Sequence, residues 1–131
     1  MAGKSDFLEN EILDHVLGNA AYTAPSTVTI ALYTVAPSDA GGGTEVTGGS
    51  YVRLSVTNNA TNFPAAAGGA KSNGTVFTFV QASADWGTVV AFGIFDGSTN
   101  LLYWGPVTPN RSVPNGATAS FAVGDLDVTE D

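Results

Sequence analysis

The chain lacks cysteine and has a single histidine, His15, among its 131 residues. The missing thiols exclude disulfide scaffolds, thiolate metal sites and cysteine nucleophiles. One imidazole also excludes zinc sites that need two or more histidines from the same chain. Positive charge is scarce too, because four Lys and Arg stand against twelve Asp and Glu, which gives a net charge of −8 at pH 7. Phosphate backbones and anionic lipid headgroups would repel such a chain, so we expect neither nucleic acid nor a membrane as partner.

Long hydrophobic runs are also missing. The longest apolar stretches fall short of the roughly 20 residues that a membrane-spanning helix needs. The first residues lead into an acidic segment instead of a hydrophobic signal core. We therefore expect a soluble protein without an export signal. Its length fits a single domain over residues 1–131.

Residues 5–17 carry the pattern of one amphipathic helix. Ser5 can cap its first turn, and acidic residues crowd the turns that follow, where the helix dipole favours carboxylates. The apolar residues make a broad stripe and are Leu8, Ile12, Leu13, Val16 and Leu17. Gly18-Asn19 provides the stop signal. We assign residues 1–20 to an N-terminal helical arm.

After this helix the hydrophobic period changes from about four to two, which indicates strands. Strands are predicted at residues 27–35, 51–57, 76–80, 88–95, 101–104, 120–123 and 125–129. The run 88–95 is apolar on both faces and should lie centrally. About seven or eight short strands without helices between them predict a mainly β fold, an antiparallel β-sandwich over residues 26–129 with one N-terminal α-helix.

Residues 58–74 interrupt the strand pattern. The stretch consists mostly of Asn, Ala, Gly and Ser, and Phe63 is one of its few candidates for a core position. Such a composition predicts a long surface loop, or an arm that becomes ordered against a partner.

Candidates for catalysis or metal binding are weak. Asp14 and His15, with Glu11 one turn away, lie on the polar face of the predicted helix without a neighbouring nucleophile, so we interpret them as solvated. The glycine-rich stretches lack the lysine spacing and the following helix of a phosphate-binding loop. Acidic residues near the C-terminus do not form a 12-residue calcium loop. We expect no enzyme, no catalytic residue, no metal and no cofactor.

Aromatic residues offer an alternative function. Tyr51, Trp86, Tyr103 and Trp104 could form a flat platform on which sugars stack. Both tryptophans border the most apolar segments, and we therefore interpret them as core residues.

The order of several short segments is more specific than any one of them. The segments are LDHVL at 13–17, AYTAP at 21–25, IALYT at 30–34, DAGGGTEV at 39–46, DWGTV at 85–89, FGIFD at 92–96, NLLY at 100–103 and GDLDV at 124–128. Together they resemble a family of small tailed-bacteriophage virion proteins over about residues 7–129. Members are often labelled tail fibre protein, and similar proteins act as cement or decoration proteins of the head.

This resemblance implies a structural protein of the virion, on its head or its tail. A fibre shaft usually carries repeats or heptads, and the sequence has neither. We therefore expect a cement protein that binds the outer surface of the head and stabilises joints between major capsid protein subunits, with avidity from many copies. The alternative is a tail fibre or tail-tip protein that binds tail proteins or host surface glycans. An enzyme that uses Asp14 or His15 is the third hypothesis.

We expect the contacts with neighbouring subunits to come from the N-terminal helix or from the 58–74 arm. The partners would be the major capsid protein and copies of the chain itself, as a homo-oligomer. The residues selected for these contacts are Phe7, Leu8, Ile12, Phe63 and Lys71.

Overall fold

The computed structural model describes residues 3–97 and 99–130, which form one helix and ten strands. Helix α1 spans Asp6–Val16. The strands are β1 (Gly3–Lys4), β2 (Thr27–Val35), β3 (Thr44–Glu45), β4 (Leu54–Thr57), β5 (Ala70–Ser72), β6 (Phe77–Thr78), β7 (Gly87–Phe95), β8 (Leu101–Val113), β9 (Ser120–Phe121) and β10 (Asp127–Thr129). The mainly β, antiparallel, sandwich-like fold with one N-terminal helix confirms the predicted fold class.

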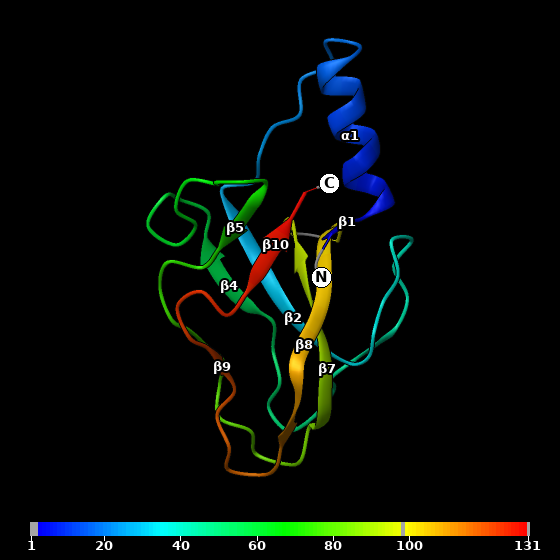
Figure 1. Cartoon of the computed structure of the whole chain (residues 1–131). Helices are drawn as coiled ribbons and strands as arrows, with labels where there is room; N and C mark the ends of the chain where they lie inside the picture. Colours follow the sequence, from blue (N-terminus) through cyan, green and yellow to red (C-terminus); the bar gives the residue numbers. More distant parts are fainter. Residues whose placement is uncertain (1–2, 98, 131) are drawn as a thin grey trace.

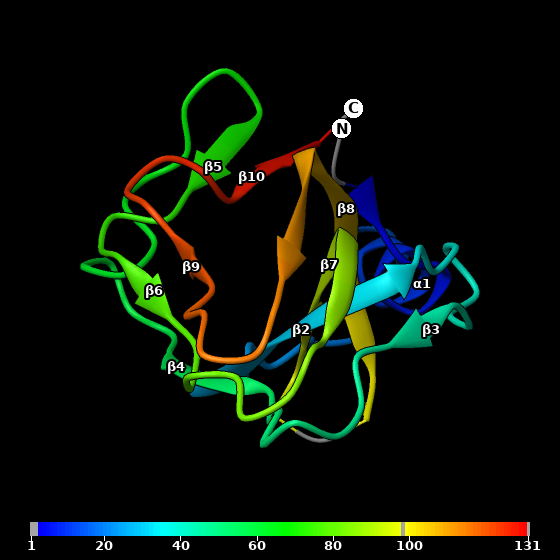
Figure 2. The same cartoon turned by 90° about the horizontal axis from the view of Figure 1, so that it is seen from below.

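One large sheet forms the first layer. Its order is β1-β8-β7-β2-β3, and β4 also pairs with β2. Strand β7 lies between β8 and β2, which confirms the central position predicted from its two apolar faces. Two short ribbons, β5 with β10 and β6 with β9, face this sheet and form the second layer (Figures 1 and 2). Helix α1 is the one helix of the described part, and no helix there is long and apolar enough to cross a membrane.

The main core fills the space between the large sheet and the ribbons. Alternate residues of β2, such as Ile30, meet Phe77, Phe121 and Leu126 of the second layer. A smaller core on the other face of the sheet includes Ala31, Tyr33, Ala91, Phe95 and Leu101. The middle of β2 is therefore buried on both faces, although the alternation of apolar and polar residues in 27–35 predicts a single buried face. Burial of the second face is completed by Arg53, whose guanidinium carbon lies 3.8 Å from the centre of the Phe95 ring.

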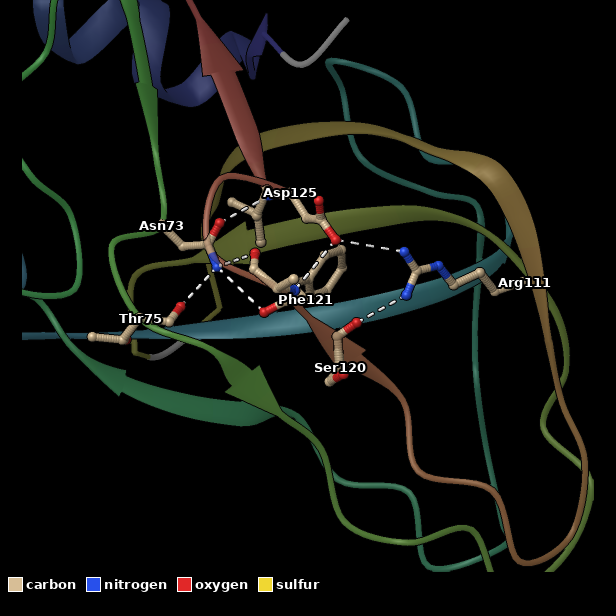
Figure 3. A network of polar contacts seen from close by, with 8 residues as sticks. Asn73, Thr75, Arg111, Ser120, Phe121 and Asp125 are labelled. Carbon is tan, nitrogen blue, oxygen red and sulfur yellow. Dashed lines mark hydrogen bonds and ion pairs between the residues drawn. The ribbon is translucent and has the colours of Figure 1, made fainter.

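The side chain of Asn73 holds the second layer together (Figure 3). It is 1% exposed, and its Nδ2 donates to the carbonyl oxygens of Thr75 at 2.8 Å and Ala122 at 2.9 Å. Its Oδ1 accepts from the backbone N–H of Leu126 at 3.0 Å, and its backbone carbonyl accepts from Gly124 at 3.0 Å. One buried amide thus connects the end of β5 with the chain between β9 and β10.

The structure also corrects several predicted boundaries. Strand β8 continues through Pro106 and Pro109 to Val113, whereas the sequence predicted a strand over 101–104 alone. Strand β1 pairs only with Tyr103 and Trp104, so the rest of β8 lies at the edge of the sheet, where proline is tolerated. The predicted strand 51–57 begins only at Leu54, and Val52 is 62% exposed.

The 58–74 segment is only partly a loop. Its residues Ala70–Ser72 form β5, which pairs with β10, and Asn73 is buried beside them. Residues 58–69 contain no strand and lie at the surface. Residues 58–69 therefore fit the predicted surface loop, and their ordering against a partner stays a prediction.

Replacing Asn73 with alanine should destabilise the fold. The change leaves the buried N–H of Leu126 without its partner, and an unsatisfied buried group costs about 1–3 kcal/mol. It also removes the hydrogen bonds to the carbonyls of Thr75 and Ala122, each worth about 0.5–1.5 kcal/mol. Urea unfolding should show a loss of at least about 2 kcal/mol for Asn73→Ala. The control Asn110→Ala changes an exposed residue and should stay within about 0.5 kcal/mol of the wild type. Equal stability of both variants would contradict this role of Asn73.

Candidate interaction surface

The first turn of α1 is fixed to the end of β8. The Ser5 N–H donates to Leu102 O at 2.8 Å, and the Ser5 hydroxyl donates to Leu101 O and accepts from the N–H of Leu8. The Asp6 N–H donates to Asp39 O at 2.9 Å. Leu8 is 3% exposed. The predicted cap at Ser5 is thereby confirmed, and the start of the helix is tied to the β-sheet.

The second half of α1 stands clear of the strands (Figure 1). Leu13, Val16 and Leu17 are 55%, 66% and 78% exposed. Asn19, with a φ of 57°, reverses the chain after the helix, which confirms the predicted stop. Three large apolar side chains thus project into solvent from the end of a helix that is anchored at its other end. These side chains stay exposed when the chain folds. Exposed apolar side chains grouped in this way are typical of a surface that another molecule covers.

A groove of about 590 Å³ opens beside the anchored half of α1. It lies between the helix, residues 22–25, the 58–71 part of the arm, and the ends of β8 and β10. Apolar side chains dominate its walls and include Leu8, Ile12, Phe63, Leu102, Leu126 and Val128. Its volume and apolar lining make the groove a candidate site for apolar side chains of another molecule.

Four of the five residues selected from the sequence lie at this groove. Leu8 and Ile12 come from α1, Phe63 comes from the arm, and Lys71 comes from β5. Phe7 does not join them, because it lines a second hollow beside the glycine-rich loop 39–43. The sequence indicated that the helix and the arm could make contacts, and the fold brings them together on one surface.

Lys71 differs from the other basic residues. Its Nζ lies 3.2 Å from the carbonyl oxygen of Phe63, and it has no carboxylate partner within residues 3–97 and 99–130. The other basic side chains form the ion pairs Lys4–Glu130, Arg53–Glu45 and Arg111–Asp125. The groove therefore has an exposed positive charge at its rim, on a chain that is strongly negative overall.

Tyr103 and Glu130 complete the polar part of the groove. Burial, followed by the nearby Glu130 carboxylate, raises the pKa of Tyr103 to about 12. Glu130 is neutralised by its ion pair with Lys4. The raised pKa thus extends the range over which the tyrosine is uncharged into more alkaline solution.

The second hollow, of about 670 Å³, contains a clamp centred on Glu45. Arg53 donates to both carboxylate oxygens at 2.9 and 2.8 Å, and the Tyr51 hydroxyl donates at 2.7 Å. Burial alone would raise the pKa of Glu45, but the hydrogen bonds from Arg53 and Tyr51 lower it below its usual value. Tyr51 also accepts from Leu32 N at 2.9 Å, so the clamp joins the chain after β3 to β2.

The four aromatic residues considered for sugar stacking do not share one exposed face. Trp86 is 4% exposed, and its Nε1 donates to Gly49 O at 2.8 Å, which confirms its core position. Tyr51 packs edge-on against Trp86, with ring centres 5.3 Å apart. Tyr103 packs against the same core, whereas Trp104 packs against the core on the other face of the sheet and donates to Asp39.

The groups considered for chemistry also lie apart from the groove. Asp14 and His15 are exposed on α1, and His15 Nδ1 accepts from the Tyr22 N–H at 3.2 Å. Within the described ranges, no group of three or more His, Asp or Glu side chains could hold a metal ion. Asp131, one of the acidic residues considered for calcium, lies outside the described residues.

Comparison with known families gives one match. The family model described as Podophage GP4 fiber I protein gp80 matches residues 3–129, which include α1, the arm and all the strands described above. Among curated proteins, no match is found.

The same leucine-to-alanine change, made at Leu8 in α1 and at Leu17 directly after it, should distinguish a side chain that stabilises the fold from one that is free for interaction. Leu8→Ala removes a buried side chain and should cost about 2–5 kcal/mol of folding stability. Leu17→Ala removes an exposed one and should change stability by no more than about 0.5 kcal/mol. Urea unfolding of the two purified variants measures both values. A large loss for Leu17→Ala would mean that its side chain is covered within the chain.

The Glu45 clamp should make stability depend on pH. Because its pKa is lower in the folded state, the clamp contributes fully above the unfolded value of about 4.3 and is lost as the pH falls through the folded value. The stability advantage of the wild type over Glu45→Gln should therefore shrink on acidification, as urea unfolding at several pH values can measure. Arg53→Met removes the partner and should abolish the same acid-dependent difference. Parallel pH profiles of wild type and both variants would rule out this contribution.

Proposed function

We propose that this chain, which belongs to the Podophage GP4 fiber I protein gp80 family, is a structural component of a phage tail fibre. The match over residues 3–129 carries the proposal, because it covers the β-sandwich together with the helix and the arm. It makes the chain a member of a phage fibre family of virion structural proteins. Its description favours the tail alternative over the head-cement role that we expected first from the sequence.

The structure supports attachment through the α1 end of the molecule. Strands and cores keep the β-sandwich rigid, whereas the exposed half of α1 and the groove lie together at one end. Proteins commonly recognise one another when the apolar face of a helix on one molecule binds in an apolar groove of the other. A fibre component needs such a surface to bind the next structural subunit.

We also propose that the role is structural and not enzymatic. The groove is dominated by apolar side chains, and its charged groups are Lys71 and the Glu130 that pairs with Lys4. Tyr103 and Glu130 do lie together, but burial and the carboxylate raise the pKa of the tyrosine, which disfavours the phenolate that would act as a nucleophile.

A head-cement role is the second candidate, and one observation favours it. The described strands form a sandwich of short elements without a repeated shaft unit, and the net charge is −8. An acidic domain of this kind suits an outer surface away from DNA. Its partner there would be the major capsid protein.

Immunogold electron microscopy of intact virions should distinguish the two roles. Antibodies against this chain should label the tail, and antibodies against the major capsid protein should label the head as a matched control. Purified chain should not raise the melting temperature of expanded empty heads. Gold over the head surface, together with stabilised heads, would replace the fibre role with the cement role.

A further inference from the structure

We propose that the groove beside α1 receives the exposed half of α1 from a second copy of the same chain. This inference rests on the proposed structural function and names the partner of its interaction surface. Leu13, Val16 and Leu17 of one copy would fill the apolar groove of the next. The contact joins two different surfaces. Each copy would therefore insert its helix into one neighbour and accept the helix of another neighbour in its own groove.

A helix cannot fill the groove of its own chain. Leu8 and Ile12 already form one wall of that groove. With about 100° of rotation per residue, Leu17 lies roughly opposite Leu8 around the helix axis. Leu17 therefore points away from the groove that Leu8 lines, and its burial requires a second molecule.

Charge favours this arrangement over a direct pairing of two helices. The helix carries four acidic residues, Asp6, Glu9, Glu11 and Asp14. Two such helices paired outside the groove would bring like charges together with no positive side chain near them, which is unfavourable. The groove instead offers Lys71, which has no carboxylate partner in the described part of the chain. By its position on the helix, Glu9 flanks the stripe of Leu13 and Val16, so an acidic group would approach Lys71 when the stripe enters the groove.

The overall charge of −8 per copy also limits where copies can meet. Long-range repulsion opposes association, and contact is favourable only where apolar burial and local opposite charge outweigh it. The surface formed by α1 and the groove provides both.

A contact between two different surfaces has a definite outcome in assembly. If the rotation that relates neighbouring copies returns to its starting point after a whole number of copies, they form a ring. If it does not, they form an open filament. Either result is a repeated structure built from a chain that has no internal repeat.

Mixing two variants tests the proposal. The helix variant, Leu13→Asp with Leu17→Asp, keeps an intact groove. The groove variant, Ala66→Glu with Lys71→Glu, keeps an intact helix, and all four positions are exposed, so both variants should fold. Analytical ultracentrifugation should show that the wild type self-associates and that each variant alone is weakened at least about tenfold, or 1.4 kcal/mol. An equal mixture should form a 1:1 dimer that grows no further.

Several results would overturn the inference. A wild type that stays monomeric at all concentrations excludes this contact. Variants that do not combine, although the wild type self-associates, point to pairing of identical surfaces. The control Val52→Asp introduces the same charge at an exposed valine away from α1 and should leave association unchanged. Loss of association in this control would also contradict the proposal.

A charge exchange gives a second readout. Lys71→Glu should weaken association, and adding the Glu9→Lys change on the same chain should restore it, because every interface then regains one opposite pair. Absence of rescue would contradict the placement of Glu9 near Lys71. These measurements are independent of the position in the virion. Tail labelling without self-association would overturn this inference alone, and head labelling with self-association would overturn the proposed function alone.

Discussion

The buried amide of Asn73 connects two parts of the chain that are distant in sequence. Its oxygen and nitrogen bond to residues 75, 122 and 126, while the ribbons on either side consist of strands only two or three residues long. Strands this short are not stable by themselves and need a packed face. The amide accepts a hydrogen bond from the backbone of Leu126 and thereby positions this residue so that its side chain is fully buried in the core. Because Leu126 and Val128 also line the groove, the groove depends on the same hydrogen bonds.

Helix α1 combines two different environments within 11 residues. Its first turn belongs to the folded domain, since Ser5 bonds to β8 and Leu8 is buried. Its last turns project from the domain and contribute nothing to the cores. Stability and recognition are therefore carried by neighbouring residues of one element. Such a division allows the interaction surface to change in sequence while the fold is kept.

Local patterns predicted α1 and β7 well, but only the first residues of β8, the longest strand. Residues 5–17 and 88–95 were predicted close to α1 and β7, because cap, period and apolar composition are properties of the segment itself. The second layer was less predictable, since Asn73 resembles its neighbours in an Asn- and Gly-rich stretch and its burial depends on distant residues. Periodicity likewise revealed the apolar stripe of α1, but not that its second half is uncovered. Four of the five residues predicted to make contacts lie at the groove because helix and arm, predicted separately, meet in the fold.

Lack of an internal repeat was the main physical argument against a fibre. That argument assumes that one chain must supply the periodic structure of the fibre. A compact domain with a protruding helix and a groove can supply it through successive copies, because each contact leaves one helix and one groove available. The scarcity of positive charge has a matching role in the proposed contact. Lys71 has no carboxylate partner among residues 3–97 and 99–130, and α1 is acidic, so this charge pattern favours one orientation of the copies over others. The acidic composition from which we expected neither nucleic acid nor a membrane as partner thus also favours the single, directed contact that we propose between copies.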